Sequence, residues 1–87
     1  MIFGNEEVMI LKDYPFIDTF KHESGNLKGT RGFVQGIVSE GEFKGCYIVV
    51  PYNISVDYIY CNRDEIMTFV ECYNKLVKLE GNRRTNL

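Results

Sequence analysis

The sequence contains no tryptophan and no alanine, and only one histidine, two prolines and three cysteines among its 87 residues. Alanine is normally among the commonest residues of globular proteins. Because alanine codons begin with GC, its absence beside abundant Asn, Ile, Lys and Tyr indicates an AT-rich coding genome. Small proteins of bacteriophages and other mobile elements often have this composition, as do proteins of low-GC bacteria. The composition therefore favours such an origin without identifying a family.

The sequence also lacks a strong excess of charge of either sign. Its formal net charge is −2, whereas general nucleic-acid binders usually carry a marked basic excess. The last six residues, NRRTNL, contribute +2, so residues 1–81 carry about −4. We expect one globular domain over residues 1–81, followed by a short basic tail over residues 82–87.

No apolar run approaches the roughly 20 residues that a membrane span requires, and the first residues show no basic segment typical of a signal peptide. The three cysteines, Cys46, Cys61 and Cys72, are odd in number and widely spaced. They predict free thiols in a reducing cytoplasm rather than a disulfide framework. Because structural zinc sites use closely spaced cysteine pairs, the spacing also predicts no metal site. No motif indicates a cofactor.

The clearest element that the sequence predicts is an amphipathic helix over residues 63–80. Asn62 and Glu65 have the spacing of a capping box, and Gly81 is a natural helix terminator. Apolar residues then recur at helical spacing and form one stripe. The stripe consists of Ile66, Phe69, Val70, Tyr73, Leu76 and Val77.

Strand-like segments precede this helix. Residues 32–38 and 46–50 flank a turn-rich connector and predict an antiparallel hairpin, which Pro51 ends. Residues 55–60 predict a further strand that pairs back on it, and residues 7–11 an earlier one. Residues 16–22 fit either a strand or a two-turn helix capped by Asp13, and the β-branched residues there favour the strand.

Together these elements predict an α+β fold. We expect a four- to five-stranded antiparallel meander, with the C-terminal helix packed on one face against alternate residues such as Ile48, Val50 and Ile59. A small OB-like barrel is the alternative, because the glycine-punctuated hairpin suits a strongly coiled sheet.

The stretch ESGNLKGTRGFVQG, residues 23–36, holds four of the eight glycines. Its spacing does not match a phosphate-binding loop, which requires a lysine after the last glycine and a helix behind it. We expect a hairpin turn around residues 24–26, with kinks at Gly32 and Gly36. Lys28 and Arg31 remain candidates for contact with an acidic surface or a phosphate backbone.

Residues suited to catalysis are few. His22 is the only imidazole, so it would have to act with Asp18 or Cys46. No spacing joins these residues, and Cys46 falls inside a predicted strand. The sequence therefore predicts a protein that is not an enzyme.

Tyrosines gather on the last two predicted strands. If the helix covers one face of the sheet, Tyr47, Tyr58 and Tyr60 lie on the exposed face. Such side chains anchor protein interfaces and also stack on the bases of single-stranded nucleic acid. Because neighbouring charges include Glu40, Glu42 and Asp57, a protein partner is favoured.

The sequence thus predicts a small cytoplasmic regulator that acts by binding another protein, such as a phage-encoded inhibitor of a host or defence enzyme. The predicted binding residues are Tyr47, Tyr58, Tyr60, Lys28 and Arg31. The sequence also favours a homodimer, since an exposed aromatic face or an unpaired edge strand can bind a second copy of the chain. The alternative is a nucleic-acid-binding module that uses the basic loop and the tyrosines.

Overall fold

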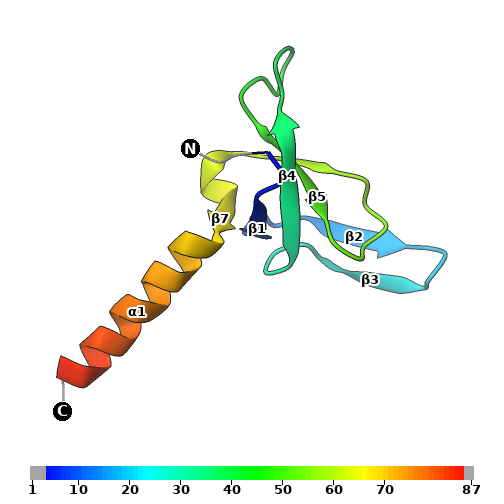
Figure 1. Cartoon of the computed structure of the whole chain (residues 1–87). Coiled ribbons are helices and arrows are strands. Elements are labelled where there is room, and N and C mark those ends of the chain that lie inside the picture. The colour runs from blue at the N-terminus through cyan, green and yellow to red at the C-terminus, as the bar shows by residue number, and fades with distance from the viewer. Residues whose placement is uncertain (1–3, 86–87) are drawn as a thin grey trace.

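The computed structural model describes residues 4–85, and it shows a curled five-stranded antiparallel sheet, a separate two-stranded hairpin and one C-terminal helix (Figure 1). The strands are β1 (Glu7–Ile10), β2 (Pro15–Asp18), β3 (Glu23–Asn26), β4 (Arg31–Ile37), β5 (Tyr47–Pro51), β6 (Ile59–Cys61) and β7 (Ile66–Thr68). A 3-10 turn, η1 (Arg63–Glu65), precedes β7, and helix α1 (Phe69–Thr85) follows it. The predicted α+β class is confirmed.

The five-stranded sheet has the order β6-β5-β4-β1-β7, and alternation along its strands separates an inner face from an outer face. Inner residues pair with one another across the strands, as Val34 does with Val49. Leu27, from the loop that follows β3, is fully buried with them. The buried apolar core is Val8, Ile10, Leu27, Val34, Val49, Ile59, Cys61 and Ile66. Among the described elements no layer spans the outer face of the sheet, although the start of α1 lies beside it at β1 and β7.

The predicted hairpin of β4 and β5 is present, and its two glycines have different roles. At Gly36 the pairing register shifts, so a β-bulge bends the strand there as the sequence indicated. Gly32 is instead a point of close approach, since a Cβ atom on it would lie 2.6 Å from the carbonyl oxygen of Val50. The hairpin therefore requires the absence of a side chain at residue 32 and bends at residue 36.

The sheet curls so strongly that its two edge strands, β6 and β7, are connected by the short η1 turn alone. The backbone N–H of Leu11 donates to the carbonyl of Glu65 over 2.8 Å, and Lys12 Nζ donates to the carbonyl of Tyr60 over 2.7 Å. These bonds tie the chain after β1 to both edges. The result is a half-barrel. Its sheet is strongly curled, as in the OB-like barrel that was the alternative prediction.

The helix begins at Phe69, six residues later than predicted. The expected cap at Asn62 exists, with its N–H donating to Glu65 Oε1 over 2.8 Å, but it opens only the 3-10 turn. Residues 66–68 then form a strand, because Ile66 pairs with Ile10 and buries its side chain in the core. A second cap starts α1: the Glu71 N–H donates to Thr68 Oγ1 over 3.2 Å.

The predicted packing of the helix across the sheet is also corrected. Helix α1 extends away from the sheet and lies beside it only at β7 and β1 (Figure 1). It also continues through Gly81 instead of ending there. The register explains the difference, because Ile59 pairs with Val49 on the inner face while Ile48 pairs with Tyr60 on the outer face. The residues expected beneath the helix do not share one face.

The β2–β3 hairpin resolves the alternative for residues 16–22 in favour of a strand, followed by a turn. The turn lies at residues 19–22, so the turn expected at residues 24–26 is wrong, and those residues belong to β3. Asp18 fixes the actual turn, because its Oδ1 accepts hydrogen bonds from the N–H groups of Phe20 and Lys21. The strand expected over residues 55–60 is likewise shorter and covers only β6.

Candidate functional site

Three aromatic rings lie in contact on the outer side of edge strand β6. The ring centroids of Tyr58 and Tyr60 are 5.5 Å apart, and those of Phe43 and Tyr60 are 5.0 Å apart. Tyr60 comes from β6, Tyr58 from the segment before it, and Phe43 from the loop between β4 and β5. About half of the Phe43 and Tyr58 side chains stays exposed, at 48% and 51%.

These rings line a pocket of about 310 Å³, which we call the aromatic groove. Its lining residues are Lys12, Tyr14, Phe43, Tyr58, Ile59 and Tyr60. Tyr14 enters from the segment that leads into β2, where its N–H donates to Asn26 Oδ1 over 2.9 Å. Three separate loops therefore converge on one concave surface whose walls are mainly aromatic.

The polar groups of the aromatic groove are largely satisfied within the chain. Lys12 Nζ donates to the Tyr60 carbonyl and lies 3.9 Å from Glu65 Oε1, so its charge is balanced locally. A side-chain hydrogen bond with Tyr58 raises the pKa of the Tyr60 hydroxyl above its ordinary value. The Tyr60 hydroxyl is consequently neutral at physiological pH, and the groove offers rings and hydroxyl groups rather than a net charge.

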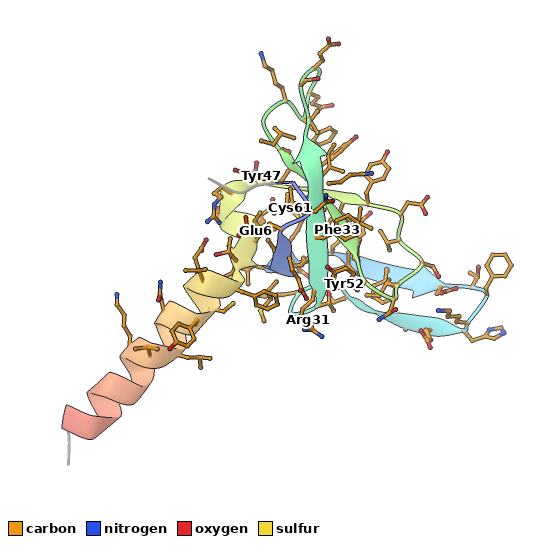
Figure 2. The ribbon with its side chains drawn as sticks, in the orientation of Figure 1. Glu6, Arg31, Phe33, Tyr47, Tyr52 and Cys61 are labelled. Atoms are coloured by element: carbon orange, nitrogen blue, oxygen red, sulfur yellow. The ribbon has the colours of Figure 1, made fainter. Side chains whose placement is uncertain are left out.

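Tyr47, which the sequence placed with Tyr58 and Tyr60, lies on the opposite face of the sheet. It pairs with Cys61 in the register and packs against the buried core (Figure 2). The prediction failed there because residues 47 and 60 belong to different strands, and only the pairing register decides which side chains share a face.

Lys28 and Arg31 lie outside the aromatic groove as well. Lys28 belongs to the turn after β3, where its N–H donates to Asn26 Oδ1 over 2.9 Å. Arg31 begins β4 on the outer face, and its guanidinium lies 3.6 Å from the Glu7 carboxylate. Figure 2 shows Arg31 at the same end of β4 as Phe33 and Tyr52, whose rings stack with centroids 5.8 Å apart.

The residues that the sequence offered for catalysis, Asp18, His22 and Cys46, do not all come together in one site. The Asp18 carboxylate accepts a hydrogen bond from Ser55 Oγ, which lowers the pKa of Asp18. His22 lies in the exposed turn with a positive φ of 53°. Cys46, directly before β5, contacts Asn62 Oδ1 through its Sγ at 3.5 Å. Burial raises the pKa of the Cys61 thiol to about 11, so this group is protonated and unreactive at neutral pH.

No protein-family model, curated protein or solved structure matches this chain. The geometry of the side chains is therefore the basis for a functional conclusion. Among residues 4–85, no group of three or more His, Cys, Asp or Glu side chains has the arrangement to hold a metal ion. Within the same residues, no helix combines the length and apolar character needed to cross a membrane.

Two members of the aromatic groove, Tyr14 and Phe43, were not predicted from the sequence. Both lie in turn-rich segments, where an apolar ring is easily taken for a side chain packed under a loop. Single apolar residues are common on protein surfaces, so neither Tyr14 nor Phe43 gave a distinct signal in the sequence.

Proposed function

We propose that this chain is a non-enzymatic protein-binding module whose aromatic groove receives an apolar segment of another protein. The observation that carries the proposal is the half-exposed cluster of Phe43, Tyr58 and Tyr60 at a concave surface. Rigid aromatic side chains lose little conformational entropy on binding and dominate the energetics of protein interfaces. A partner side chain inserted between these rings would bury them from water.

The charges around the groove indicate the kind of partner. Glu40 and Glu42 are exposed in the loop that carries Phe43, and Asp57 is exposed beside Tyr58. An apolar segment flanked by lysine or arginine would complement this rim and be selected over an acidic one. Such a module, working in the cytoplasm, regulates by occlusion: it covers a surface that its partner needs. A phage-encoded inhibitor of a host or defence enzyme is the concrete form that we propose.

The proposal is tested by capturing partners from cells of the organism that encodes the chain, with matched tyrosine variants. Tyr58→Ala removes a ring of the aromatic groove, whereas Tyr52→Ala removes an exposed ring in the turn after β5. We expect the purified partner to bind the Tyr58→Ala variant at least about 10-fold more weakly, as is typical of an interface anchor, and the Tyr52→Ala variant almost normally. Equal loss in both variants, or no partner in any preparation, would refute the proposal.

A second candidate function rests on Arg31 beside the stacked pair of Phe33 and Tyr52. The half-buried ring of Phe33 and the exposed ring of Tyr52, next to a guanidinium, could stack on bases and neutralise the backbone of single-stranded nucleic acid. The Glu7 carboxylate beside Arg31 weakens that attraction, so this function ranks second. It requires oligonucleotide binding that falls steeply with added salt and that is lost in the Tyr52→Ala variant.

A further inference from the structure

One half of helix α1 presents a continuous apolar surface that the rest of the described chain leaves uncovered. We call this surface the helix stripe, and it consists of Phe69, Val70, Tyr73, Leu76 and Val77. Val70, Tyr73 and Leu76 are 66%, 67% and 61% exposed. The opposite half of the helix carries Glu71, Asn74, Lys75 and Lys78. The helix is thus amphipathic, but its apolar half faces water.

A groove runs beside the helix stripe, where α1 leaves the sheet. This helix groove has a volume of about 380 Å³, and it lies between the first turns of α1 and the outer face of β1 and β7. Met9 and Met67 pair across these two strands and form its floor. The full lining is Met9, Leu11, Met67, Cys72, Lys75 and Leu76.

We propose that the helix stripe and the helix groove together form the interface of an antiparallel, two-fold symmetric homodimer. A two-fold interface must be self-complementary, so a single chain has to offer both the projecting and the receiving surface. This chain does so: Tyr73 and Val77 project from the helix, and the groove lies at the base of the same helix. When two helices run antiparallel, the outer turns of each one lie over the groove of the other.

The exposed area is sufficient for a specific dimer. The five residues of the helix stripe are 44% to 67% exposed, which leaves roughly 500 Å² open on each protomer. Complete coverage of both stripes would remove about 1,000 Å², the lower bound for a specific interface. The first turns of the 17-residue helix pack on β7 and β1, but its outer turns project into water, and an isolated stretch of helix that short is only marginally stable. The outer turns of α1 therefore need a covering surface whenever the chain is folded. A second copy of the same chain is the one partner that is present under all such conditions.

The helix dipoles favour the antiparallel arrangement. Antiparallel pairing sets the partly positive start of one helix beside the partly negative end of the other, whereas parallel pairing sets like ends together.

Sedimentation and small-angle scattering of the full chain test this dimer. We expect a mass twice the 10.1 kDa of one chain in the micromolar range, and a maximum dimension well above the 50 Å long axis of one protomer. A monomer at every concentration would overturn the proposal. A dimer no longer than one protomer would overturn the antiparallel arrangement, because two parallel copies lie side by side.

Two lysine variants separate the helix stripe from the rest of the helix. Tyr73→Lys places a charge in the interface and is expected to weaken the dimer on the order of 100-fold, because a buried unpaired charge is costly. Asn74→Lys, one residue away on the polar half, is expected to leave it intact. Equal effects in both variants would refute the interface. Tyr58→Ala leaves this surface unchanged, so the dimer and the partner groove can fail independently.

Discussion

Asp18 links the β2–β3 hairpin to the half-barrel through polar contacts, beside the apolar packing of Phe16 and Leu27. Its Oδ1 accepts hydrogen bonds from the N–H groups of Phe20 and Lys21 at 3.0 and 3.1 Å, which fix the turn. Its Oδ2 accepts the hydroxyl of Ser55, in the connection between β5 and β6. One carboxylate therefore holds a local turn and a distant loop at once. Because this role needs the charged form, it depends on pH.

We predict that Ser55→Ala raises the pKa of Asp18 toward its ordinary value of 3.8. The hydrogen bond from Ser55 is the largest of the causes that lower the pKa of Asp18 in the folded chain. A depressed carboxyl pKa stabilises the folded state above the pKa of the unfolded chain, and this contribution disappears as pH falls through the folded-state value. The variant is therefore less stable than the parent at neutral pH, and the difference shrinks below about pH 4.

Titration of the Asp18 carboxyl by NMR, together with urea unfolding at several pH values, measures both effects. Ser39→Ala is the matched control, because Ser39 is exposed in the loop between β4 and β5. The assignment fails if Asp18 titrates at the same pH in the parent and in the Ser55→Ala variant.

At the scale of elements, the start of α1 is decided by Thr68. The sequence Thr68-Phe69-Val70-Glu71 has the spacing of a capping box, and Thr68 Oγ1 lies 3.1 Å from Glu71 Oε1. Arg63 forms an ion pair with the same carboxylate, which ties the η1 turn to the first turn of the helix. The direction in which the helix leaves the sheet is therefore fixed by a small set of side chains.

We predict that Thr68→Val frays the first turn of α1. Valine keeps the shape of the buried side chain but removes the oxygen that accepts the Glu71 N–H, a loss that typically costs about 1 kcal/mol of unfolding free energy. Thr68→Ser keeps the oxygen and is expected to retain helical Cα chemical shifts at residues 69–71, whatever its lost methyl group costs in stability. Normal helical shifts in the valine variant would contradict this role.

The two capping boxes show how much of this region the sequence could reveal. Both Asn62–Glu65 and Thr68–Glu71 are readable, but local spacing does not tell which one opens the long helix. The residues between them, Ile66 to Thr68, fit a helical stripe and also fit the alternation of a strand. Pairing with β1 decides in favour of the strand, because it buries Ile66 against Ile10. Such a long-range contact leaves no trace in the local sequence.

Only part of the aromatic groove could be predicted, because the rest of it also depends on contacts between distant segments. Tyr58 and Tyr60 are two residues apart, so their shared side follows from strand periodicity alone. Tyr47 belongs to another strand, and Phe43 and Tyr14 come from loops whose paths depend on the whole fold. The α+β class could be predicted from the sequence because it depends only on the number and type of the elements. The residues of the site could not be predicted, because they depend on the register in which the strands pair.

At the scale of the whole molecule, the half-barrel and the outer turns of α1 have different sources of stability. The half-barrel has its own buried core, centred on Val34 and Val49. The outer turns of the helix project away from the half-barrel, beyond the groove that Lys75 and Leu76 line (Figure 1). In the proposed dimer they are covered by the partner, and the two aromatic grooves then lie on separate half-barrels. A partner protein with two binding segments would engage both at once and gain avidity.

We predict that hydrogen exchange separates these two parts by their dependence on protein concentration. Amides in the outer turns of α1, at residues 75–78, are expected to exchange faster as the protein is diluted through the dissociation of the dimer, because each monomeric helix opens locally. Amides of Val34 and Val49 exchange only through opening of the half-barrel, which a single copy resists by itself. The Tyr73→Lys variant should show fast helix exchange at every concentration, and Asn74→Lys should match the parent. Helix exchange that is slow and independent of dilution in the Tyr73→Lys variant would mean that α1 is stable without a second copy.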